Sequence, residues 1–93
     1  MNAADDPVLN QFREQISDTD RAIVDAINTR LELVARIKAY KESRGIDFLD
    51  PDRERSMLRE LARANPGPLS NEGLRELFTT ILELTKREVA QDD

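Results

Sequence analysis

Apolar residues recur at alternating steps of three and four along the first half of the chain. A helix turns once in 3.6 residues, so positions with this spacing share one helix face. The stripe, called the seam below, consists of Leu9, Phe12, Ile16, Thr19, Ile23, Ala26, Arg30, Leu33, Ile37 and Tyr40. Asp6 followed by Pro7 is typical of a helix start, and Gly45 is typical of a helix end. The pattern predicts one helix over residues 7–44.

Two shorter helices are expected after this long one. Asp50 and Pro51 again combine an N-cap with a proline in the first turn, and the Asn-Pro-Gly-Pro run at residues 65–68 ends the second helix. Ser70 is a natural N-cap for the third helix, which carries a broad apolar stripe. The sequence therefore predicts a single all-α domain over residues 1–93, with a long, a short and a medium helix over about 7–44, 51–64 and 71–90.

The predicted long helix cannot bury its seam within one chain. At 1.5 Å per residue it would extend about 55 Å, which exceeds the width of a compact domain of this size. A domain of 93 residues also buries a smaller share of its surface than a larger domain does. We therefore expect an intertwined homodimer, in which the long helix of a second copy runs antiparallel and covers the seam.

Composition and charge exclude several classes of function. The chain has no histidine and no cysteine, so imidazole bases, thiol nucleophiles and the usual zinc ligands are absent, and we expect no metal and no cofactor. Its 19 acidic and 14 basic residues give a net charge of −5 without a basic block, which disfavours nucleic acid as a partner. No apolar run suits a membrane span and residues 1–7 do not resemble a signal peptide, so we expect a cytoplasmic protein that binds no membrane.

Arg30 is the charged residue of the seam. Desolvating an arginine is unfavourable unless it meets an anion, so Arg30 predicts either a bound anionic ligand or a buried ion pair with an acid such as Glu54. Lys41 lies within about 20° of the same helix face, so its ammonium and the Arg30 guanidinium can converge on one small organic anion. The alternative for Lys41 is a surface residue that complements the helix dipole.

Further candidate residues lie near the starts of the first and second predicted helices. Arg13 is about 25 Å from Arg30 along a straight helix, but the Arg13 of an antiparallel partner can reach the same pocket; otherwise Arg13 is a solvated arginine. Asp50, Arg53 and Glu54 occupy the cap and first turn of the second predicted helix, where backbone N–H groups favour anions. The alternative there is a solvated capping turn.

Together these residues resemble the all-helical class of chorismate mutases, over residues 8 to about 89. The resemblance rests on the run Asp50-Pro51-Asp52-Arg53-Glu54-Arg55 and on the combined spacing of Arg13, Arg30, Lys41, Asp50, Arg53 and Glu54. It implies conversion of chorismate to prephenate, a 3,3-sigmatropic rearrangement within one molecule that needs no acid, base, nucleophile, metal or cofactor. Catalysis then means holding the reactive conformer and stabilising the charge that develops as the ether C–O bond breaks.

The resemblance also implies roles for individual residues. Lys41 would contact the ether oxygen, and Glu54, beside Asp50, would accept a hydrogen bond from the substrate hydroxyl. The planar fork of arginine suits carboxylates. The arginines that would bind the two substrate carboxylates are Arg30, Arg53 and, from the partner chain, Arg13.

The end of the third predicted helix departs from the family pattern. Thr85 stands where the family has a small hydroxyl residue, but Val89 replaces the Gln or Glu that usually follows four residues later as a second donor to the ether oxygen. Glu88 lies close to the same face, so a protonated Glu88 is one substitute. Without it the site lacks this donor, at a cost of about 100-fold or more in rate.

Several alternatives stay open from the sequence. Relatives of this fold act as mutases of 4-amino-4-deoxychorismate or as isochorismate pyruvate-lyases. A non-enzymatic helical dimer or partner-binding module is an answer of a different class, although such a protein would not need Arg30 in its seam. The resemblance also leaves open whether the chain works alone or docks onto a larger shikimate-pathway enzyme.

Overall fold

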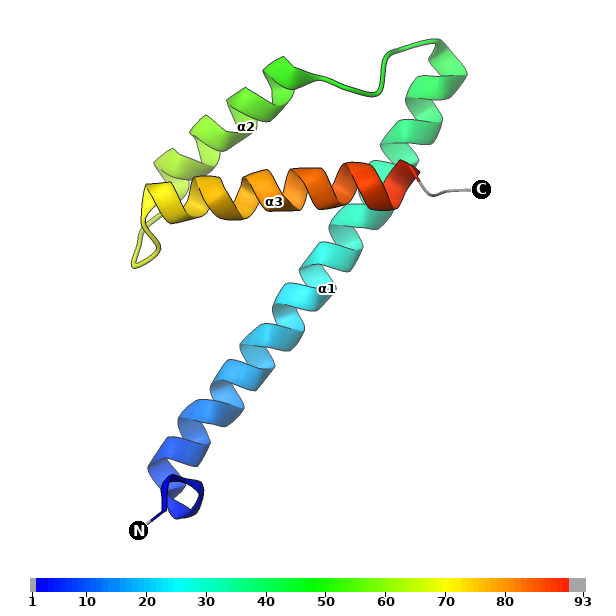
Figure 1. The fold of residues 1–93 in the computed structure, drawn as a ribbon. Coiled ribbons are helices and arrows are strands. Elements are labelled where there is room, and N and C mark those ends of the chain that lie inside the picture. Colours follow the sequence, from blue (N-terminus) through cyan, green and yellow to red (C-terminus); the bar gives the residue numbers. More distant parts are fainter. Residues whose placement is uncertain (1, 91–93) are drawn as a thin grey trace. The chain divides into compact units, whose positions relative to one another are not determined.

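The computed structural model describes residues 2–90, which form three α-helices (Figure 1). They are α1 (Pro7–Arg44), α2 (Pro51–Ala64) and α3 (Asn71–Ala90), and the part of the chain described holds no strand. A short 3₁₀ helix, Ala3–Asp5, precedes α1 and was not predicted from the pattern. The all-α prediction and the order of long, short and medium helix are confirmed.

The helices begin at the caps that the sequence indicates. The carboxylate of Asp6 accepts hydrogen bonds from two N–H groups of the first turn of α1, at 2.9 and 3.1 Å. Asp50 accepts one from the N–H of Arg53 at 3.1 Å, and the hydroxyl of Ser70 accepts one from the N–H of Gly73 at 2.9 Å. These N–H groups have no acceptor within the helix, so each cap stabilises its helix by about 1 kcal/mol.

The end of α1 is set by Gly45. Its φ of 68° lies in the left-handed region, which glycine adopts without the steric penalty of a Cβ atom. The N–H of Ile46 donates to the carbonyl of Lys41 at 2.9 Å, and the N–H of Gly45 donates to that of Glu42 at 3.3 Å. This pair of bonds is a Schellman motif, which ends the helix and directs residues 46–50 away from it.

The chain divides into two units between Glu32 and Leu33, within α1. None of the residues described in the first unit is buried, so this part of the chain has no core of its own. Large apolar side chains there are more than half exposed: Val8, Phe12, Ile16, Ile23 and Val24.

The second unit contains the last turns of α1 together with α2 and α3. Residues 65–70 join α2 and α3, which pack against each other as a hairpin (Figure 1). The buried side chains among the described residues are all on α3: Leu74, Thr85 and Val89. This core is small, and the seam residues of the unit stay about half exposed: Leu33, Ile37 and Tyr40. Across residues 2–90, no helix combines the length and apolar character that crossing a membrane requires.

Candidate active site

The first turn of α2 presents Glu54 to α3. Asp50 caps this turn, and the carboxylate of Glu54 forms an ion pair with Lys86, whose Nζ lies 2.9 Å from Oε1. The Glu54 side chain is 29% exposed and that of Lys86 is 42% exposed. The contact therefore holds the Glu54 carboxylate in a partly buried position between two helices.

Lys86, the partner of Glu54, is a cation that the sequence analysis did not single out. It follows Thr85 directly, but a lysine near the end of an amphipathic helix is ordinarily solvated, so its position alone gave no signal. Its partner is 32 positions earlier and on another helix, beyond the reach of any local pattern. The hairpin of α2 and α3 creates the pair.

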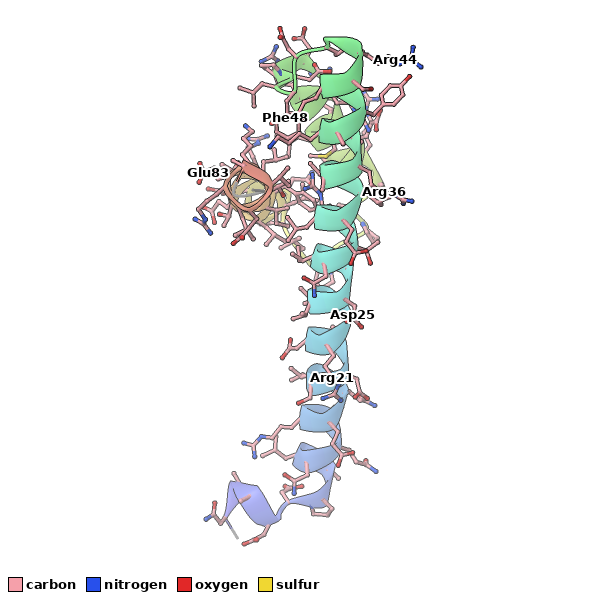
Figure 2. All side chains as sticks on the ribbon, turned by 90° about the vertical axis from the view of Figure 1, so that its right-hand side faces the viewer. Arg21, Asp25, Arg36, Arg44, Phe48 and Glu83 are labelled. Carbon is pink, nitrogen blue, oxygen red and sulfur yellow. The ribbon has the colours of Figure 1, made fainter. Side chains whose placement is uncertain are left out.

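Lys41 is held against the segment that leads into α2. Its ammonium donates a hydrogen bond to the main-chain carbonyl of Phe48 at 3.2 Å, two residues before the α2 cap. Figure 2 shows Phe48 on the opposite side of α1 from Arg36 and Arg44. Lys41 is half-buried. The expected cation thus contacts the segment that leads into α2, whose cap and first turn carry Asp50, Arg53 and Glu54.

The end of α3 turns Val89 inward and Glu88 outward. Val89 is 5% exposed, whereas Glu88 is exposed. The carbonyl of Val89 accepts a hydrogen bond from the ammonium of Lys38 at 3.2 Å, and this ammonium also lies 4.0 Å from Glu42. Lys38 is a second cation that the sequence did not single out.

The remaining candidates differ in their surroundings. Thr85 is buried one turn before Val89, and its hydroxyl donates to the carbonyl of Ile81 at 2.7 Å. Arg53 is exposed, with its guanidinium 4.0 Å from Glu60. Arg13 is exposed and Arg30 is half-buried, and both belong to the first unit. The second unit therefore contains the candidate residues of α2, α3 and the end of α1, whereas Arg13 and Arg30 lie in the first.

Comparison with known proteins decides the family. The family model of chorismate mutase type II matches residues 12–89, which include all of the candidate site residues. The chain belongs to the chorismate mutase type II family. It is thus a member of a family of isomerases, as the resemblance implied.

Members of the chorismate mutase family from several bacteria resemble the chain. The structure of chorismate mutase (Form II) from Thermus thermophilus has a TM-score of 0.86 and 29% identity, over 91% of this chain and 97% of that one. A 4-amino-4-deoxychorismate mutase of Streptomyces pristinaespiralis is 34% identical over 86 residues, 91% of this chain and 66% of the relative. A bifunctional chorismate mutase/prephenate dehydratase of Stutzerimonas stutzeri is 33% identical over 79 residues, 80% of this chain and 22% of the relative. The chain spans only part of the length of both sequence relatives.

In this chorismate mutase type II fold, three ammonium groups are held by contacts between segments of the second unit. Lys38 contacts the end of α3, Lys41 contacts the segment before α2, and Lys86 contacts Glu54 on α2. Cations fixed by a scaffold stabilise negative charge without reorganising during a reaction. The described residues contain no cluster of three or more potential metal ligands of the His, Cys, Asp or Glu type.

Proposed function

We propose that the chain catalyses the rearrangement of chorismate to prephenate, a step of aromatic amino acid biosynthesis. The observation that carries this proposal is the Glu54 carboxylate, held by Lys86 in a partly buried position on a chain of the chorismate mutase family. The reaction breaks one ether C–O bond and forms one C–C bond within the same molecule. It exchanges no proton or electron with the protein, which agrees with a chain that has no histidine and no cysteine.

Electrostatic stabilisation and positioning supply the rate enhancement. Negative charge develops on the ether oxygen as the C–O bond breaks, and Lys41 is the donor that we place there. An ammonium has three N–H donors, so the bond from Lys41 to the Phe48 carbonyl leaves donors for the substrate. Arg30 and Arg53 bind the substrate carboxylates and so hold the compact conformer from which the reaction proceeds.

A second copy of the chain completes this site. The seam side chains of the single chain are exposed, with Phe12 at 58%, Ile23 at 55% and Ile37 at 49%. Burying a large apolar side chain contributes about 1.5–3 kcal/mol, so a partner that covers the seam gains substantial free energy. In an antiparallel dimer the partner also supplies its Arg13 to the substrate.

We place no donor at position 89 of this site. Glu88 is exposed and the inward residue is Val89, so the alternative in which a protonated Glu88 replaces the family donor lacks support. Lys41 is then the main contact to the ether oxygen. A site that is complete in the dimer also needs no larger shikimate-pathway enzyme for activity, although the bifunctional relative joins two activities in one protein.

A second candidate substrate is 4-amino-4-deoxychorismate. The Streptomyces relative that carries this activity in its name aligns with 91% of the chain. The two substrates differ in the ring substituent that Glu54 would contact. In this proposal, the groups around the Glu54 carboxylate decide which of the two substrates is preferred.

The proposed activity is tested by incubating the purified chain with chorismate and identifying the products by chromatography. Prephenate is the expected product, and Lys41→Met is expected to lower its rate of formation by at least about 100-fold. Pyruvate together with an aromatic acid would indicate a lyase instead. The absence of any turnover of chorismate or of its 4-amino analogue would contradict the proposal.

The non-enzymatic alternative is tested by thermal unfolding with a bicyclic mimic of the transition state. A ligand specific for the folded protein raises the melting temperature, and the rise increases with the logarithm of the ratio of ligand concentration to Kd. We expect such a rise for the unmodified chain and a smaller one for Lys41→Met. An unchanged melting temperature at millimolar mimic would favour a partner-binding module.

A further inference from the structure

Glu54 is the acceptor proposed for the substituent at carbon 4 of the substrate ring, and its carboxylate already has a cationic partner. The Nζ atom of Lys86 lies 2.9 Å from Oε1 of Glu54. Both side chains are partly buried, so charges here are screened less than on an open surface. A carboxylate accepts several hydrogen bonds, so Glu54 can bind a substrate donor while it keeps Lys86.

The two candidate substrates differ at this contact. Chorismate has a hydroxyl at carbon 4, whereas the 4-amino analogue has an amine, and aliphatic amines are protonated at neutral pH. With about 2.9 Å for each contact to the carboxylate, a substrate ammonium on Glu54 would lie within about 6–8 Å of the Lys86 ammonium. Two positive charges at this separation repel each other, while a neutral hydroxyl meets no such repulsion.

We propose that Lys86 makes the site selective for a hydroxyl over an ammonium at carbon 4 of the substrate ring. The inference rests on the proposed function of the site and names the substrate class within it. Lys86 balances the charge of Glu54, so the carboxylate offers an acceptor without a net negative charge to attract a cation. Both substrates carry the same two carboxylates, so the attraction of Lys86 to them cancels when the two are compared.

The test is the ratio of kcat/KM for chorismate to kcat/KM for 4-amino-4-deoxychorismate. We expect Lys86→Met, which removes the charge and keeps the length, to lower this ratio by about tenfold. Lys86→Arg keeps the charge and is expected to keep the ratio. Both values come from one preparation, so the fraction of folded enzyme cancels and a partly unfolded variant still gives the ratio. Lys86→Gln provides a second neutral variant for the same measurement.

The matched control is Arg87→Met, which removes an exposed cation from the next position of α3. It changes the net charge of the protein as Lys86→Met does but leaves the Lys86–Glu54 ion pair in place. We therefore expect it to leave the ratio unchanged. An equal fall of the ratio in Arg87→Met and Lys86→Met would overturn a specific role for Lys86. An unchanged ratio in Lys86→Met and Lys86→Gln would overturn it as well.

Failure of the proposed function has a different signature. If the unmodified chain converts neither substrate, the proposed activity is wrong and the selectivity assigned to Lys86 falls with it. If the unmodified chain is active and the ratio is the same in every variant, only the inference about Lys86 is overturned. A ratio that falls in both neutral variants and holds in Lys86→Arg supports it.

Discussion

The ammonium of Lys38 donates a hydrogen bond to the main-chain carbonyl of Val89 at 3.2 Å and thereby joins α1 to the last turn of α3. The last four carbonyls of a helix have no donor within the helix, and the helix dipole places partial negative charge there. The Lys38 side chain is only 24% exposed, so this contact is shielded from water. It anchors the end of α3 that carries Thr85 and Val89.

Lys38→Met is therefore expected to destabilise the protein. A hydrogen bond with a charged donor contributes about 1.5–3 kcal/mol to the free energy of unfolding. Methionine cannot donate this bond but keeps the packing of the aliphatic part of the side chain. Urea unfolding at fixed protein concentration measures the change. Arg36→Met is the control, because Arg36 is exposed on the other side of the same helix (Figure 2). Equal stability of the two variants would contradict a structural role for the Lys38 contact.

Ile23→Asp is expected to convert the protein to monomers. Ile23 is a seam residue that is 55% exposed in the single chain, and a carboxylate there would be desolvated at the proposed interface. Sedimentation velocity at micromolar concentration reports the oligomeric state. Asn28→Asp adds the same charge at an exposed polar position of α1 and should remain a dimer. A monomeric Ile23→Asp variant with full activity would rule out a shared active site.

Mixing two inactive variants is expected to restore activity. If each site combines Arg30 of one chain with Arg13 of the other, then Arg13→Ala and Arg30→Ala homodimers both lack an arginine in every site. A mixed dimer has one site with both arginines and one site with neither. Random exchange of equal amounts then regenerates about a quarter of the original sites. Chorismate turnover after unfolding and refolding the mixture measures this, and no gain over the separate variants would refute sharing.

The end of α3 provides a fourth prediction. Glu88 is exposed, so Glu88→Gln and Glu88→Ala are expected to change kcat by no more than about twofold. Val89→Gln restores an amide donor on the inward face and is expected to raise kcat. The same change places a polar group at a position that is 5% exposed, so it should lower the free energy of unfolding by about 1–3 kcal/mol. A tenfold loss of kcat in either Glu88 variant would show that Glu88 reaches the substrate.

The amino-acid sequence by itself determined the elements and the family. Each helix begins at a side chain that caps its own first turn, as Asp6, Asp50 and Ser70 do, and Gly45 follows the last residue of α1. These interactions join residues at most a few positions apart, so local spacing reveals them. The family was evident for a similar reason, because the order and spacing of its charged residues can be followed along the chain without knowing where they meet.

The contacts between helices were decided only by the tertiary structure. Lys86 meets Glu54 across 32 positions, and Lys38 meets the Val89 carbonyl across 51. Periodicity indicates which residues share a face of one helix, but the partner of that face depends on the path of the connecting loops and on how each helix is rotated when the apolar faces pack. The same rotation turns Val89 inward and leaves Glu88 exposed. The two residues are adjacent in the sequence, so the helical pattern alone does not decide which of them faces inward.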